Sequence, residues 1–227
     1  MAVKLFSLGL PGSGKSTVAR YIHAYAKDYH WSVAHRNDYA ILQEMFLNDT
    51  EHKFKPADVG GFDVLDLTVF DTALKRLEEE AQRYNSDAKS EEIISLEFSR
   101  ANYEHAFRQF SREFLQDQDT YFLYLAAELN TCKQRISNRA ADPLFEDDYP
   151  VSEYIFEKYY HQDDGRYLPN ILEREYQIDR QQVMIIENNG SLEAVSTEIN
   201  AFIDFIVSQA SSHVATANAY KGLVAVY

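Results

Sequence analysis

The feature that most constrains this chain is residues 9–16, with the sequence GLPGSGKS, which follow an apolar run over residues 3–8 and open a segment of helical periodicity. This spacing of glycines, lysine and serine is that of a phosphate-binding loop between a strand and a helix. Glycines let backbone N–H groups approach phosphate oxygens, and the amino end of a helix favours a bound anion. The residues predicted to surround the phosphates are Gly9, Gly12, Ser13, Gly14, Lys15, Ser16 and Thr17.

The 227-residue chain has the size of one α/β domain with a small lid, and it carries no apolar run of about 18 residues that could span a membrane. A single cysteine, Cys132, and the lack of a signal-peptide pattern predict a cytoplasmic protein without a membrane partner. The net charge of −14 argues against a nucleic-acid partner. A nucleotide is also a polyanion, so its site requires a local cluster of basic side chains.

Five apolar segments alternate with segments of helical periodicity, which predicts a three-layer α/β/α fold around a five-stranded parallel sheet. The predicted strands cover residues 3–8, 31–35, 92–98, 120–126 and 182–187. Residues 48–63 are polar and predicted to be irregular, whereas one helix with an aromatic face is predicted over residues 103–114. Residues 1–210 are expected to form a single domain, followed by a tail over residues 211–227.

Charged residues that follow predicted strands are candidates for the site, because the carboxyl ends of parallel strands lie at the same edge as the phosphate loop. Asp38 follows the second strand. It either acts on a substrate at the site or is the N-cap residue of a helix over residues 39–47. Glu97 ends the third strand and is a candidate for holding Mg²⁺, although Asp38 is an alternative. Arg100 is either an acceptor or phosphate contact or an ordinary surface arginine.

Arg135 and Arg139 lie four residues apart on a predicted helix and form a cationic stripe. The helical periodicity stops after Arg139, and polar stretches follow as far as about residue 175. We expect residues 139–175 to form a lid over the site rather than a surface insertion, with residues 39–84 as an arm on the acceptor side.

On these residues the chain resembles the small P-loop kinases, a group that includes adenylate, shikimate and gluconate kinases, chloramphenicol phosphotransferase and the zeta toxins. The resemblance implies the strand order 2-3-1-4-5, with the phosphate-loop strand at the centre. It also implies that Asp38 activates the acceptor and that Arg135 and Arg139 are lid arginines. The turn at residues 188–190, which contains Asn189, would lie beside the adenine ring.

The sequence therefore predicts an ATP- and Mg²⁺-dependent phosphotransferase that acts on a small-molecule acceptor. The expected catalytic residues are Lys15, Asp38, Arg135 and Arg139, and the expected metal site is Ser16 with Glu97. Two alternatives remain open. One is a P-loop ATPase or nucleotide-dependent switch without an acceptor, and the other is a nucleotide-sugar or polynucleotide 5′-end kinase, whose polynucleotide form the acidic surface argues against.

Overall fold

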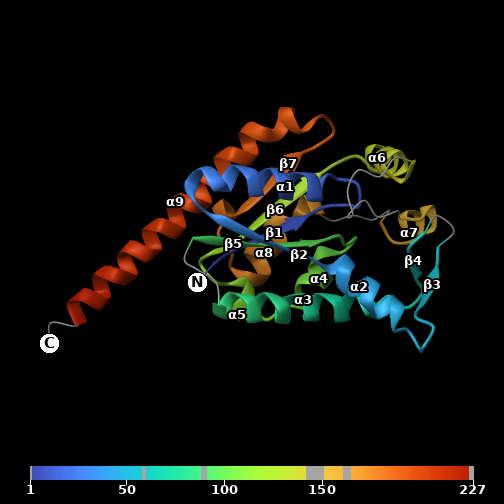
Figure 1. Cartoon of the computed structure of the whole chain (residues 1–227), viewed down its shortest axis with the longest axis horizontal. Coiled ribbons are helices and arrows are strands. Elements are labelled where there is room, and N and C mark those ends of the chain that lie inside the picture. The colour runs from blue at the N-terminus through green and yellow to red at the C-terminus, as the bar shows by residue number, and fades with distance from the viewer. Residues whose placement is uncertain (1, 58–59, 88–90, 142–150, 161–164, 225–227) are drawn as a thin grey trace.

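The structure is a computed structural model that describes residues 2–57, 60–87, 91–141, 151–160 and 165–224 (Figure 1). Its framework is a sheet of five parallel strands, β1 (Val3–Leu8), β2 (Ser32–Asn37), β5 (Glu92–Phe98), β6 (Thr120–Ala126) and β7 (Val183–Glu187). The strands lie in the order β2-β5-β1-β6-β7. This order matches the expected 2-3-1-4-5 once two short strands outside the sheet are left out of the count.

The phosphate-loop strand β1 lies in the middle of the sheet, where the protein covers both of its faces. Every residue of β1 and of its neighbour β6 is buried, as expected for parallel strands covered on both sides. Leu5 of β1 packs in one core cluster and the adjacent Phe6 packs in the other. The two faces therefore carry separate cores, and both hold the strand that leads into the loop.

Helices cover both faces of the sheet, which confirms the α/β/α layers (Figure 1). One face packs against α1 (Lys15–Ala26) and α9 (Leu192–Val224), and the other against α3 (Thr68–Asp87), α4 (Tyr103–Phe107), α5 (Arg112–Leu115) and α8 (Leu168–Tyr176). Among the described segments, no helix is both long enough and apolar enough to cross a bilayer.

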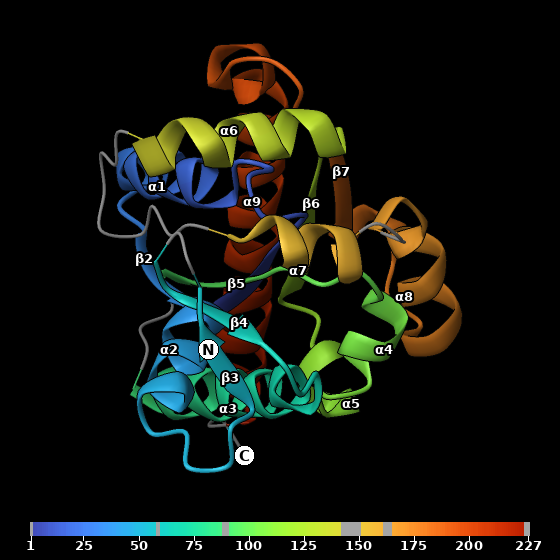
Figure 2. The same cartoon turned by 90° about the vertical axis from the view of Figure 1, so that its right-hand side faces the viewer.

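The remaining helices include those that surround the carboxyl end of the sheet. They are α2 (Asp38–Leu47), α6 (Leu129–Ala141) and α7 (Glu153–Lys158), and single 3₁₀ turns occupy Lys27–Tyr29, Gly165–Tyr167 and Arg180–Gln182. Figure 2 shows α6 and α7 on the side of the molecule that also carries the short strands β3 and β4. This side holds the candidate site.

The prediction of an irregular segment over residues 48–63 is wrong in part. β3 (Phe54–Pro56) and β4 (Phe62–Val64) pair as an antiparallel hairpin. The Phe62 ring stacks with Tyr39 and Phe46 of α2, at centroid distances of 5.4 and 5.2 Å. Strands of three residues are too short to show an alternating pattern, and the packing that supports them comes from distant aromatic side chains.

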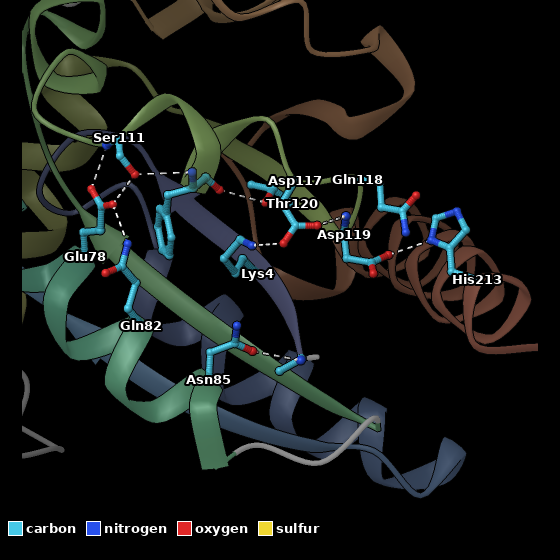
Figure 3. Close-up of polar contacts among 12 residues, drawn as sticks. Lys4, Glu78, Gln82, Asn85, Ser111, Asp117, Gln118, Asp119, Thr120 and His213 are labelled. Atoms are coloured by element: carbon cyan, nitrogen blue, oxygen red, sulfur yellow. Dashed lines mark hydrogen bonds and ion pairs between the residues drawn. The ribbon is translucent and has the colours of Figure 1, made fainter. Parts of the chain in front are cut away.

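The single helix predicted over residues 103–114 is divided into α4 and α5. Ser111 is the N-cap of α5, and its hydroxyl accepts a hydrogen bond from the Phe114 N–H at 3.4 Å. Glu78 of α3 accepts hydrogen bonds from both the backbone N–H and the hydroxyl of Ser111 (Figure 3). The aromatic face remains in the core, so periodicity was a correct guide to burial, but the contact from α3 that fixes the break is not visible in the local pattern.

The segment expected to form a separate tail begins inside α9, which continues as one helix to Val224. His213 lies at the start of this segment, and its Nδ1 is 2.8 Å from Asp119 Oδ1 (Figure 3). Close by, Lys4 Nζ donates to Asp117 Oδ2 at 2.6 Å. The His213 contact ties α9 to the residue before β6, and the Lys4 contact joins β1 to the same connection, at the opposite end of the strands from the phosphate loop. The domain boundary at residue 210 stays a prediction.

Candidate active site

The turn between β1 and α1 has the backbone of a phosphate-binding loop. Gly9, Gly12 and Gly14 have φ values of 141°, 81° and 99°, a region that strains residues with a Cβ. A Cβ on Gly12 would also lie 2.5 Å from the carbonyl oxygen of Cys132. Because α1 begins at Lys15, the N–H groups of its first turn lie beside this loop, where they can stabilise an anion.

We expect Gly12→Ala to destabilise the protein by about 1–3 kcal/mol, because the added methyl group meets a backbone carbonyl and the φ value is strained. For a domain of this size each kcal/mol lowers Tm by about 2–4 °C in a thermal melt. Gly190→Ala is the matched control, since its Cβ would lie 3.8 Å from the Ala194 Cβ, an ordinary contact. Equal Tm values for the two variants would show that the loop tolerates a side chain at residue 12.

Lys15 is only 5 % exposed, and its Nζ donates to the carbonyl oxygens of Gly9 at 3.1 Å and Leu10 at 2.9 Å. Burial lowers the pKa of Lys15, whereas the charges of Glu97 and Asp38 oppose that decrease. The two hydrogen bonds use two of the three N–H groups of an ammonium. The third can serve a phosphate oxygen while the other two hold the side chain along the loop.

Ser16, Glu97 and His35 form a chain of polar contacts next to the loop. The Ser16 hydroxyl lies 3.1 Å from Glu97 Oε1, and His35 Nε2 lies 3.4 Å from Glu97 Oε2. Burial alone would raise the pKa of Glu97, but the contact with His35 and the charge of Lys15 outweigh this effect and lower it. Glu97 therefore stays a carboxylate near neutral pH. A hydroxyl and a carboxylate oxygen in contact suit Mg²⁺, which prefers oxygen ligands and retains several waters.

The described residues contain no group of three or more His, Cys, Asp and Glu side chains that could enclose a metal ion. The Ser16 and Glu97 pair is thus an incomplete set of ligands by itself. Phosphate oxygens and waters complete such a site in nucleotide enzymes, where the protein supplies one or two ligands.

The N-cap alternative for Asp38 is wrong, because Asn37 caps α2. The Asn37 side chain accepts a hydrogen bond from the Ala40 N–H at 2.9 Å, and its backbone is extended with φ −129° and ψ 150°. Asp38 is the first residue of the helix, and it is buried. The N-cap and the first helical residue are adjacent positions, and because both Asn and Asp are favoured as N-caps, the sequence did not show which of the two residues caps the helix.

Asp38 forms a buried ion pair with Arg100, whose Nη1 lies 2.5 Å from Asp38 Oδ2. Burial raises the pKa of Asp38, and the Arg100 guanidinium offsets part of that rise. Arg100 is 3 % exposed and lies over the Phe70 ring, 4.6 Å from its centroid. The interpretation of Arg100 as an ordinary surface arginine is therefore wrong.

Arg135 joins the phosphate loop to the turn that follows β7. Its Nη1 donates to the Asn188 carbonyl at 2.9 Å and lies 3.5 Å from the Ser13 carbonyl, and its Nη2 donates to the Gly190 carbonyl at 2.7 Å. Asn188 reinforces the connection, because its Nδ2 donates to the Ser13 carbonyl at 2.7 Å. The neighbouring Asn189 accepts from the Glu128 N–H at 2.8 Å instead. A role for Asn189 beside a base stays a prediction.

A cleft of about 780 Å³ brings most of the predicted site residues together. Its lining includes Gly12, Gly14, Lys15, Ser16, Thr17, Asp38, Glu97, Arg100, Arg135 and Arg139. Gly9, Ser13 and Asn189 do not line it in the described part of the chain. Arg139 is close enough that its charge lowers the pKa of Lys15. One cleft therefore connects the phosphate loop with Asp38 and with the arm of residues 39–84 that follows it.

Three contacts that support the site were not predicted from the sequence. The Gly9 N–H donates to the Tyr103 hydroxyl at 2.8 Å, Asn188 contacts the loop, and His35 contacts Glu97. His35 could have been found, because it lies near the end of the second strand, as Asp38 does. Tyr103 gave no such signal, since its place in an aromatic stripe indicated only burial.

The predicted lid, residues 139–175, is described only in part. Residues 142–150 and 161–164 lie outside the described residues. Leu168 and Leu172 of α8 belong to the main core cluster, so the last part of the expected lid is packed into the body of the domain.

No protein-family model and no curated protein matches this chain. In structure it is similar to Chaetomium thermophilum Kti12 in complex with ADP-AlF3, at 13 % identity, covering 89 % of this chain and 98 % of that one, with a TM-score of 0.51. It is also similar to Acinetobacter baumannii shikimate kinase in complex with shikimate, at 16 % identity, covering 92 % of this chain and 95 % of that one, with a TM-score of 0.46. A third similar structure is an unliganded sugar kinase from Janibacter sp., at 15 % identity, covering 90 % of this chain and 95 % of that one, with a TM-score of 0.46. The likeness to Kti12 supports the P-loop fold.

Proposed function

We propose that this protein is an ATP- and Mg²⁺-dependent phosphotransferase whose acceptor is a hydroxyl group of a small molecule. The observation that carries the proposal is that Lys15, Ser16 and buried Asp38 line the same cleft. Its volume of about 780 Å³ is within the range of small-molecule sites. A protein that only bound a nucleotide would need the phosphate loop but no carboxylate beyond it.

The phosphate half of the cleft would bind ATP through charge and backbone N–H groups. Lys15 and the first turn of α1 would contact the β- and γ-phosphates, and Arg139 would neutralise charge on the group that moves. Arg135 would act on this half indirectly, because its donors hold backbone carbonyls of the loop and of the turn at residues 188–190. We therefore assign Arg135 a positioning role in place of the catalytic role first expected.

Ser16 and Glu97 would hold Mg²⁺, since their oxygens are in contact and the lowered pKa of Glu97 keeps it ionised. When bound, the metal would neutralise phosphate charge. His35 would orient Glu97 from the opposite side, through the 3.4 Å contact of its Nε2 with Oε2.

Asp38 would accept the proton of the acceptor hydroxyl. The acceptor oxygen forms a bond to the γ-phosphorus while the bond from that phosphorus to the bridging oxygen of ADP breaks, so the products are ADP and a phosphate ester. Burial raises the pKa of Asp38, which makes its carboxylate a stronger base than an exposed one. The ion pair with Arg100 fixes its orientation.

We propose that α7, together with the described residues just before it, forms a cover over the cleft. Val151, Ser152 and Ile155, at the start of α7, line the cleft, and the Ser152 hydroxyl contacts buried Asp63 of the β3–β4 hairpin. The hairpin and α7 would therefore close together and exclude water from the transfer.

The test is ATP turnover measured with and without a mixture of hydroxylated metabolites, with product detection by labelled γ-phosphate. A phosphotransferase should be accelerated by its acceptor and should label one compound. Slow turnover that no mixture accelerates would instead indicate the ATPase or switch function.

A further inference from the structure

The part of the cleft beyond Glu97, which we name the acceptor chamber, is lined mainly by apolar and aromatic side chains. In the described residues these are Tyr39, Leu42, Phe62, Val64 and Phe70 on the arm side, and Val151, Ile155 and Tyr160 on the lid side. Phe62 is held by stacking with Tyr39 and with Phe46, which lies outside the lining. Such a wall favours a ligand with an apolar or aromatic body.

The charged groups of the chamber balance each other. Besides its bond to Asp38, Arg100 Nη1 donates to the Ser99 carbonyl at 2.6 Å, and Nη2 donates to the Phe70 carbonyl at 3.0 Å. Within the described part of the chain, buried Arg100 Nε has no hydrogen-bond partner. Among the described residues that line the chamber, the positive charge of Arg100 is paired with Asp38, so it is not available to an anion.

Most other polar groups around the chamber are engaged by the protein itself. The Tyr160 hydroxyl donates to the Ser99 carbonyl at 3.3 Å, and the Ser152 hydroxyl contacts Asp63. Asn37 uses its side-chain oxygen to cap α2. A ligand with many hydroxyl groups would leave several of them unpaired on burial, which is costly.

We propose that the acceptor is an uncharged molecule with an apolar ring or a comparable apolar body and one reactive hydroxyl, and that the chamber excludes carboxylates and phosphate esters. This inference rests on the proposed function and names its substrate class. The hydroxyl would meet Asp38, and the apolar body would lie against Phe62.

The test compares benzyl alcohol with 4-(hydroxymethyl)benzoate, which share a ring and a hydroxyl group but differ in one carboxylate. Binding is measured by ligand-observed NMR on the full chain with Mg²⁺ and a non-hydrolysable ATP analogue, so that it does not depend on phosphoryl transfer. We expect benzyl alcohol to bind at least about 100-fold more tightly, because burial of an unpaired carboxylate costs several kcal/mol. Phosphorylation of both probes from ATP is then measured separately.

Two variants assign the selectivity to the chamber. Tyr39→Arg adds a cation at a half-buried position and should shift the binding ratio at least about tenfold toward the carboxylate. Phe62→Leu should weaken benzyl alcohol binding by about three- to tenfold. Phe205→Leu, at a half-buried position in the other core cluster and outside the lining, is the control and should leave binding unchanged. Thermal melts check that each variant is folded.

The outcomes separate this inference from the proposed function. Selective binding of benzyl alcohol without phosphorylation would support the chamber assignment and count against phosphoryl transfer to this probe class. Equal binding of both probes, tighter binding of the carboxylate, or no binding of either at millimolar concentration would overturn the inference. Preference for the carboxylate would mean that Arg100 exchanges Asp38 for the ligand.

Discussion

Lys15→Met is expected to lower kcat/KM for ATP by about 30- to 1,000-fold, with the fold retained. The variant keeps most of the aliphatic stem, which is buried, and removes the ammonium that would stabilise the β- and γ-phosphates. Loss of one such charged contact costs about 2–4 kcal/mol in the transition state. The measurement is steady-state turnover of ATP, together with a thermal melt.

Lys75→Met is the matched control, because it makes the same chemical change on the exposed surface of α3. It should leave kcat/KM unchanged. Full turnover by a folded Lys15→Met protein would exclude residues 9–16 as the catalytic nucleotide site.

Asp38→Asn is expected to lower phosphoryl transfer by about 10²- to 10⁴-fold, the range for a positioned acid–base group. It should also lower the free energy of unfolding, since the buried charge of Arg100 loses its partner, and breaking a buried ion pair costs about 3–5 kcal/mol. The asparagine can still accept one hydrogen bond from Arg100, so the loss should fall at the lower end. ATP binding through the phosphate loop should stay near the wild-type value.

Arg100→Gln separates the two effects, because it breaks the same ion pair and keeps the carboxylate of Asp38. If Asp38 is the base, Asp38→Asn should be at least about tenfold slower in transfer than Arg100→Gln, at similar stability. Equal rates would mean that Asp38 affects transfer only through its ion pair with Arg100 and is not the base. Glu97 would then become the next carboxylate to test.

The parts of the site that could be predicted from the sequence are those carried by contiguous residues. The loop around Lys15 and Ser16 requires glycines at fixed spacing, so the chemistry and the local backbone are encoded together. The alternation of apolar segments with segments of helical periodicity was enough to predict the parallel sheet, and the family resemblance was enough to predict its strand order. Glu97 lies in contact with Ser16, as expected for the end of a strand, which has a fixed place relative to the loop. Its role as a metal ligand stays a prediction.

The parts that could not be predicted depend on contacts between distant residues or on side-chain direction. Arg100 and Asp38 lie 62 positions apart, and nothing in either local segment indicates that they pair. The N-cap of α2 is Asn37 and not Asp38, because the helix begins one residue earlier than predicted. Helix propensity defines such a boundary only to within one or two residues. The contact of Glu78 with Ser111 and the β3–β4 hairpin belong to the same class of tertiary effects.

The guanidinium of Arg135 connects two segments that lie far apart in the sequence, the phosphate loop near the beginning of the chain and the turn after β7 near its end. Ser13 and Asn188 are 175 positions apart, yet they share hydrogen bonds with each other and with Arg135. Their mutual placement is therefore fixed during folding and does not have to be fixed again when a nucleotide arrives. Binding to such a preorganised surface loses less conformational entropy. The affinity of this protein for nucleotide would then depend on a residue that need not touch it.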